Sequence, residues 1–155
     1  MALLSQVQFS NVKHKSLARR LVLDELFDLT LYRELSRFAG GDTKIMLGKL
    51  GPVEEGHLAF WKKFFGMEKL DRLNFSRQVK LEFLKIFCRL TGNTGIHLVL
   101  EAIEIYGIRK YLNLWKLYKD DSIGSAARNI LEDEFRHEDL IVSEYQRQQI
   151  YPERI

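Results

Sequence analysis

The chain has 155 residues, of which 46% are apolar and 29% are charged. This length is enough to bury one sizeable core, so we expect a single domain over residues 1–155. The 24 basic and 21 acidic residues nearly balance, at a net charge of +3, which gives no reason to expect nucleic acid as a partner.

Cys88 is the only cysteine, which excludes an intrachain disulfide and a metal cage made of thiolates. Its apolar neighbours predict that it is buried. The N-terminus lacks the pattern of a secretory signal, and no apolar run approaches the roughly 20 residues that span a bilayer. We therefore expect a cytoplasmic protein.

Apolar residues at helical spacing predict two long helices in the first half of the chain. The first covers about residues 14–38 and ends before Gly40 and Gly41. The second covers 42–65, with Asp42 or Thr43 as its N-cap and Gly66 as its stop. Pro52 costs a helix about 3 kcal/mol, so we expect a kink or a late helix start near Gly51 and Pro52.

The second half begins with an amphipathic segment over residues 75–91, which we expect to direct Val79, Phe83, Leu84, Phe87 and Leu90 inward. Thr91 to Thr94 then break the chain before two further helices over 94–118 and 123–149. The predicted fold is an all-α, ferritin-like four-helix bundle. It consists of two helical hairpins around a polar centre, and the segment 75–91 forms an extra helix in the crossover.

One acidic pattern occurs twice. The first copy is Glu25, Tyr32, Glu54 and His57, and the second is Glu104, Tyr111, Glu134 and His137. In both copies the Tyr follows the first Glu by seven residues and the His follows the second Glu by three, so each pair shares one helix face. One carboxylate from each of two helices, with a Glu-x-x-His from each of the other two, is the ligand set of di-iron and di-manganese bundles.

The surroundings of these acids favour a metal site over a solvated surface. A single Glu-x-x-His pair is common on exposed helix faces and is weak evidence of a metal. Here, however, the same stripes carry apolar residues such as Val22, Leu29 and Trp61. Buried carboxylates without a counter-ion are costly, so a pair of divalent ions would offset them. Oxygen and imidazole ligands suit iron or manganese.

Several residues leave alternatives open. Glu101 lies three residues before Glu104 and is an additional or alternative ligand, while His97 is expected to border the site. Tyr32 and Tyr111 are either ordinary core residues or hydrogen-bond donors to ligand carboxylates. The remaining acids near the stripes are expected to be solvated, with Glu55 and Glu138 the least secure of these: Asp24, Asp28, Glu34, Glu55, Glu132, Asp133 and Glu138.

At these residues the chain resembles the ferritin-like superfamily, particularly rubrerythrin-type domains. The phrases that carry the resemblance are Glu25 to Leu35, Glu54 to His57, Glu101 to Glu104 and Asp133 to Glu138. The resemblance implies a di-iron centre with Glu25 and Glu104, or Glu101, as terminal ligands. It implies Glu54 and Glu134 as bridging ligands, and one metal each for His57 and His137. A rubredoxin-like electron-transfer domain with four cysteines is absent from this chain.

A second resemblance is to the domain that precedes the membrane portion of vacuolar-iron-transporter-like proteins, also called membrane-bound ferritins. It rests on the segment 75–91, on Leu100 to Glu104 and on the ending Tyr151 to Ile155. It implies a soluble domain of an iron or manganese exporter, at the cytoplasmic face of a membrane and continuous with a membrane domain in a longer chain.

The leading functional expectation is iron homeostasis by a ferroxidase-type centre. Two iron ions, or manganese, would bind, and oxygen or peroxide would oxidise Fe(II). One alternative is a rubrerythrin-like peroxidase with an external reductant, and another is a regulatory module that senses metal and gates a membrane partner. A metal-free helical scaffold and a homodimer are also open at this stage.

Overall fold

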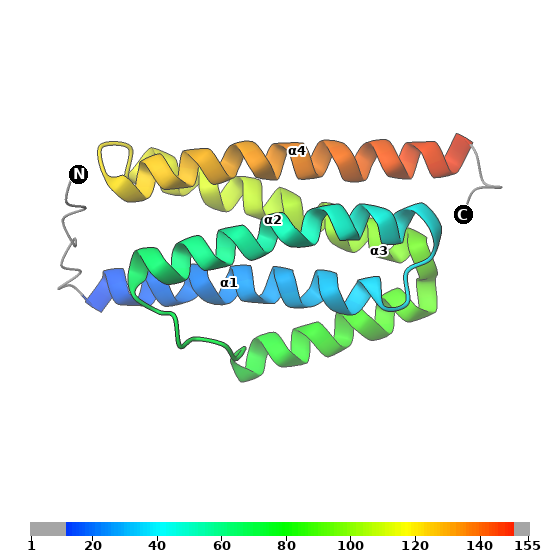
Figure 1. Ribbon diagram of the computed structural model, residues 1–155, viewed down its shortest axis with the longest axis horizontal. Coiled ribbons are helices and arrows are strands. Elements are labelled where there is room, and N and C mark those ends of the chain that lie inside the picture. The colour runs from blue at the N-terminus through cyan, green and yellow to red at the C-terminus, as the bar shows by residue number, and fades with distance from the viewer. Residues whose placement is uncertain (1–11, 151–155) are drawn as a thin grey trace.

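The computed structural model describes residues 12–150, with side chains described for residues 15–147. This part of the chain contains four helices and no strands, which confirms the all-α prediction (Figure 1). The helices are α1 (Val12–Ser36), α2 (Gly41–Phe65), α3 (Phe75–Leu117) and α4 (Ser122–Ile150). None of the described helices combines the length and the apolar character needed to cross a bilayer. The ending Tyr151 to Ile155 lies outside the described residues.

Helix α1 packs most extensively on α2, and α3 on α4. Helix α2 begins at Gly41, whose φ of 52° is a left-handed conformation that favours glycine. The predicted N-cap of α2, Asp42 or Thr43, is wrong. The N-cap is Gly40, and no side chain caps the helix. Thr43 is buried instead. At the other end Gly66 adopts the predicted left-handed C-cap, and its N–H bonds the carbonyls of Lys62 and Lys63.

Pro52 lies inside α2, which is helical from Gly41 to Phe65. A late helix start at Gly51 is therefore wrong. The proline removes one backbone hydrogen bond, but Met46, Leu50 and Leu58 on the same helix are buried in the core. Because most helix stability in proteins comes from such packing, these contacts hold the turns on both sides of the proline.

Helix α3 is broken at Gly92, whose φ of 65° and ψ of −153° are not helical. This break falls within the segment Thr91 to Thr94 where the sequence predicts one. We call residues 75–91 the outer segment and 93–117 the inner segment. The outer segment begins at the N-cap Asn74, whose side chain accepts a hydrogen bond from Arg77 N, and crosses α1 on the side away from α4 (Figure 1).

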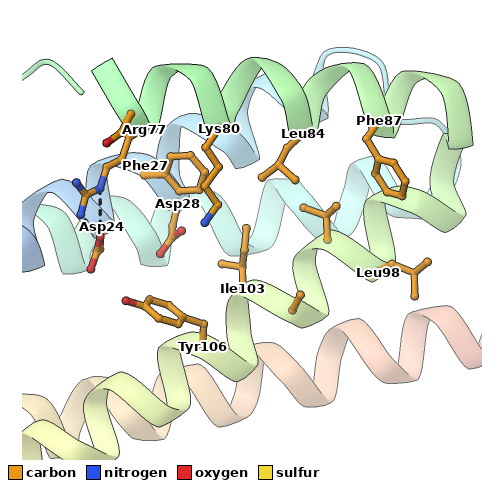
Figure 2. A pocket seen from close by; sticks show the side chains of 13 residues that line it. Asp24, Phe27, Asp28, Arg77, Lys80, Leu84, Phe87, Leu98, Ile103 and Tyr106 are labelled. Atoms are coloured by element: carbon orange, nitrogen blue, oxygen red, sulfur yellow. Dashed lines mark hydrogen bonds and ion pairs between the residues drawn. The ribbon is translucent and has the colours of Figure 1, made fainter. Parts of the chain in front are cut away.

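The outer segment faces the bundle with residues other than those predicted. Val79, Phe83, Phe87 and Leu90 were expected inward but are exposed, and Leu84 is half-buried, whereas Leu81 and Cys88 are buried. The outer segment leaves a cavity of about 720 Å³ beside α1 and the inner segment. Figure 2 shows Leu84 and Phe87 above this cavity and Ile103 and Tyr106 of the inner segment below it.

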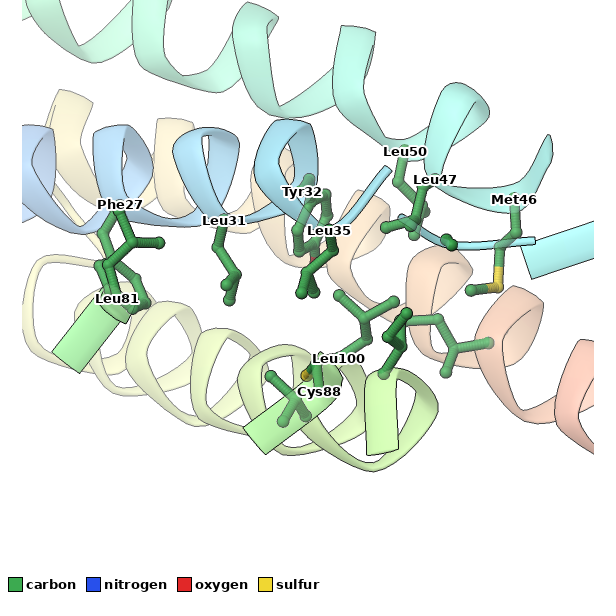
Figure 3. Close-up of a cluster of buried hydrophobic side chains, with 14 residues drawn as sticks. Phe27, Leu31, Tyr32, Leu35, Met46, Leu47, Leu50, Leu81, Cys88 and Leu100 are labelled. Atoms are coloured by element: carbon green, nitrogen blue, oxygen red, sulfur yellow. The ribbon is translucent and has the colours of Figure 1, made fainter. Parts of the chain in front are cut away.

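Two apolar clusters fill the bundle, one toward each end. The cluster in Figure 3 includes Leu35, Leu50 and Leu100, while the other includes Trp61 and Leu114. Along every helix the predicted ligands fall between residues of the two clusters. The carboxylates and imidazoles thus form a buried polar layer with apolar packing on both sides.

Candidate metal centre

The structure brings six of the seven predicted ligands together in two groups. Ligand atoms of Glu25, Glu54, His57 and Glu134 lie within 4.8 Å of one another, and so do those of Glu54, Glu104 and His137. All six side chains are buried, and each of the four helices contributes at least one. Glu54 belongs to both groups, which places its carboxylate between them.

The two tyrosines of the repeat bind the carboxylates of the opposite copy. Tyr32 on α1 donates to Oε1 of Glu104 on α3, and Tyr111 on α3 donates to Oε1 of Glu25 on α1. Both tyrosines are buried, and burial together with the neighbouring carboxylates raises their pKa well above the ordinary value. They therefore remain neutral donors that fix one oxygen of each carboxylate.

The second oxygen of each of these carboxylates has no hydrogen-bond partner. Glu25 Oε2 and Glu104 Oε2 are buried and make no hydrogen bond, and the same holds for the Nδ1 atoms of His57 and His137, although His137 Nδ1 lies 3.1 Å from Glu54 Oε1. Glu25 Oε2 lies 3.7 Å from His57 Nδ1, and Glu104 Oε2 lies 3.5 Å from His137 Nδ1. Buried polar atoms are rarely left unpaired, so these four atoms indicate two positions for a bound species, one in each copy.

Asp133 holds the ring of His57. His57 Nε2 lies 3.2 Å from Asp133 Oδ2 and donates to that carboxylate, which leaves Nδ1 as the nitrogen facing the acids. Asp133 was expected to be solvated, yet it is half-buried and contacts the His57 ring. Its place directly before Glu134 on α4 was the available signal.

Lys110 also contacts the site and was missed by the sequence analysis. Its Nζ lies 2.9 Å from Glu25 Oε1, the oxygen that Tyr111 also binds, and 4.5 Å from the centre of the Tyr111 ring. Its side chain is 9% exposed. Burial favours the neutral amine, but Glu25 outweighs it and raises the pKa of Lys110 well above its ordinary value. The centre therefore includes one permanent cation.

Gly107 leaves space for the carboxylate of Glu134. A Cβ atom at this position would lie 2.0 Å from Glu134 Oε2, so no other residue type leaves that carboxylate in place. Asp28, expected to be solvated, is half-buried at the edge of the cavity in Figure 2. Burial, with Glu25, Glu54 and Glu104 nearby, raises its pKa well above the ordinary value.

Electrostatic pairing inside the centre is strong. Burial opposes ionisation of Glu54, but the imidazoles of His137 and His57 outweigh it and lower the pKa of Glu54 to about 2. Burial also disfavours the charged form of His137, yet Glu104 and Glu54 raise its pKa to about 10. Burial and then the charges of Glu104 and Glu25 raise the pKa of Glu134. The site thus holds protons that a bound cation would displace.

The other candidates lie apart from the two groups. Glu101 is half-buried and belongs to neither, so the geometry favours Glu104. His97 is buried 3.3 Å from Thr43 Oγ1, and burial lowers its pKa. Glu55 is exposed and pairs with Arg33 at 3.1 Å.

Comparison of the chain with protein-family models, with characterised proteins and with solved structures gives no match.

Proposed function

We propose that this chain is a ferritin-like protein that binds a pair of iron or manganese ions between two helical hairpins, α1 with α2 and α3 with α4, with the outer segment as an extra helix in the crossover. The observation that carries the proposal is the set of four buried, unpaired ligand atoms. They comprise one carboxylate oxygen and one imidazole nitrogen in each copy of the repeat.

The residues present fit such a pair. Glu25 Oε2 and His57 Nδ1 would hold one ion, and Glu104 Oε2 and His137 Nδ1 the other. Glu54 would serve both, since its Oε2 lies 3.7 Å from His57 Nδ1 and its Oε1 lies 3.1 Å from His137 Nδ1. Glu134 Oε1 lies 3.9 Å from His57 Nδ1, and we assign Glu134 as the second shared ligand from its place in the repeat. A donor set of carboxylates and imidazoles without sulfur is the one that iron and manganese take in helical bundles.

Charge supports the binding of cations. The four glutamates carry four negative charges when ionised, and Lys110 carries one positive charge. Divalent ions would offset the remaining three negative charges, and uncompensated charge in the interior is costly. One divalent ion would leave a net charge of −1, and two would leave +1.

The proposed activity is oxidation of Fe(II) as a step in iron handling. With hydrogen peroxide as oxidant, two Fe(II) ions each lose one electron, and the O–O bond breaks as peroxide takes up two electrons and two protons to give two water molecules. The protein would hold the substrate ions, keep bulk water away through its apolar clusters and retain protons on Glu134 and His137 in the metal-free state.

Metal analysis of two matched variants tests the proposal. Glu54→Ala and Glu134→Ala should each lose the paired site, because the proposal assigns both carboxylates as ligands shared by the two ions. Glu55→Ala alters an exposed neighbour on the same helix and is the control. Wild type and Glu55→Ala should hold two ions of iron or manganese per chain after reconstitution and gel filtration. Retention of two tightly bound ions by both core variants would refute the ligand assignment.

The activity has its own test. Peroxide added to the Fe(II)-loaded protein should give a burst of Fe(III) with one peroxide consumed for every two iron ions. Continued consumption of peroxide when a reductant is supplied would favour a peroxidase instead. An absence of any oxidation by a protein that binds metal would favour the sensing role.

A further inference from the structure

The outer segment of α3 has a second apolar face that points away from the bundle. Its members are exposed by 80% (Phe75), 52% (Val79), 69% (Phe83), 58% (Ile86) and 83% (Leu90). At about 100° per residue these five positions fall within roughly 80° of the helix circumference, so they form one stripe. The buried residues Leu81 and Cys88 lie on the opposite side of the helix. We call this stripe the outer face.

The outer face is at the upper end of the apolar patches that monomeric proteins expose. The two phenylalanines together expose about 300 Å² and the three aliphatic residues about as much again, so the total is about 600 Å². Two such faces in full contact would bury about 1,200 Å², which reaches the lower end of the range for specific protein interfaces. No charged residue lies within the stripe.

The spacing of the residues along the stripe favours a second copy of this chain as the partner. The gaps between Phe75, Val79, Ile86 and Leu90 are four, seven and four residues, and Phe83 lies near the middle. This spacing reads the same in both directions. Two antiparallel copies therefore match: Phe75 of one faces Leu90 of the other, Val79 faces Ile86, and Phe83 lies beside its own counterpart. Such self-complementarity is what a two-fold interface between identical chains requires.

We propose that the outer face binds the outer face of a second copy of this chain, as an antiparallel helix pair with Phe83 at the two-fold axis. The pairing adds a helix to the opposite side of each outer segment, so that both apolar faces of the segment are buried. It uses none of the metal ligands and stands whether or not the centre binds metal.

Sedimentation velocity at rising protein concentration tests the pairing. The wild-type chain should sediment as a dimer from low micromolar concentration upward. Phe83→Glu places a charge at the axis, opposite the same charge in the partner, and should shift the chain to a monomer. Leu117→Glu changes an equally exposed apolar residue outside the outer face and should leave the dimer intact. Far-ultraviolet circular dichroism confirms that each variant remains helical.

Oxidative cross-linking tests the register. In a Cys88→Ser background, Phe83→Cys should form a covalent dimer because the axis brings the two sulfur atoms together. Leu90→Cys alone should not, since its expected neighbour is Phe75, whereas an equal mixture of Phe75→Cys and Leu90→Cys chains should cross-link as a heterodimer. Cross-linking of Leu90→Cys with itself and not of Phe83→Cys would overturn the antiparallel register.

Two results would overturn the proposal as a whole. One is a wild-type chain that stays monomeric at all concentrations and is pulled down by vesicles of mixed neutral and anionic lipid, which would assign the outer face to a lipid surface. The other is a dimer that Phe83→Glu leaves unchanged, which would place the contact elsewhere on the molecule.

Discussion

Lys110 Nζ lies 2.9 Å from Glu25 Oε1, and this contact makes the two halves of the centre unequal. Lys110 follows Glu104 by six residues, and the residue that follows Glu25 by six is Leu31, which is buried in an apolar cluster. Glu25 Oε1 therefore accepts from a tyrosine and an ammonium group, whereas Glu104 Oε1 accepts from a tyrosine, and no lysine or arginine among residues 15–147 pairs with Glu104.

The first prediction is that the two metal positions differ in affinity because of Lys110. An ammonium group about 5 Å from a divalent ion repels it by several kcal/mol at an effective dielectric constant near 20. The position at Glu25 and His57 should therefore bind at least tenfold more weakly. Titration calorimetry with Mn(II) should show two steps in the wild type and closer affinities in Lys110→Leu.

Lys80→Leu is the matched control, because Lys80 is exposed and lies over the Phe27 ring rather than on a ligand. Its titration should overlay that of the wild type. Two well-separated steps in Lys110→Leu would show that the inequality has another origin.

The tyrosines should act across the repeat. Tyr32→Phe removes the donor to Glu104 and should weaken the position at His137, while Tyr111→Phe should weaken the position at His57. Loss of one hydrogen bond to a charged group costs about 1.5–3 kcal/mol, or roughly 10-fold to 150-fold in affinity. The perturbed site can be identified from the histidine signals in NMR spectra with a diamagnetic ion such as Zn(II). Signals that shift at the histidine of the same copy would contradict the crossed assignment.

Gly107→Ala should separate metal binding from stability. The new Cβ would lie 2.0 Å from Glu134 Oε2, so the carboxylate must leave its position and metal binding should fall to one ion or none. The metal-free protein should be equally stable or up to about 1 kcal/mol more stable, since alanine favours helix. Chemical denaturation and metal analysis give the two readings.

Gly48→Ala, at an exposed position of α2 with open space around it, should gain stability without losing metal. A Gly107→Ala protein that still held two ions would mean that Glu134 serves the metals from another rotamer.

Metal uptake should release protons near neutral pH. Burial lowers the pKa of His137, but Glu104 and Glu54 raise it to about 10, above the ordinary value of 6.5. This protonation stabilises the metal-free fold fully below pH 6.5, and the stabilisation is lost as pH rises through about 10. An ion at Nδ1 must displace the proton, so affinity should increase with pH over this window. Calorimetry in buffers of different ionisation enthalpy counts the protons, and His137→Gln should release fewer.

The repeated Glu, Tyr and His residues were sufficient to predict that six acidic and histidine side chains meet in the core, because their spacing fixes which helix faces they share. Lys110 could not be predicted in the same way. A lysine at the edge of a helix stripe reaches solvent in most proteins, and only the position of Glu25 across the bundle shows that its ammonium group is held inside. Asp133 was missed for the same reason, since its partner His57 lies on another helix.

The outer segment shows where the helical pattern fails. Periodicity identified one apolar stripe in residues 75–91 and predicted that it faces the bundle. The residues predicted inward included Val79, Phe83 and Leu90, which are exposed, because α1 offers a surface that fits Leu81 and Cys88 on the other side. When a helix has apolar residues on two faces, its own sequence does not determine which face packs against the rest of the protein.

The break at Gly92 divides α3 into an inner segment that positions Glu104 and Tyr111 and an outer segment that positions neither. The inner segment must keep Glu104 and Tyr111 in register with α1 to better than one residue, since both side chains bond across the bundle. Because the backbone at Gly92 is not helical, a rotation of the outer segment about its own axis is not transmitted to the inner segment. The outer segment can therefore turn, lengthen or change its surface residues without moving the ligands, which leaves recognition of a partner free to diverge while the polar layer stays fixed.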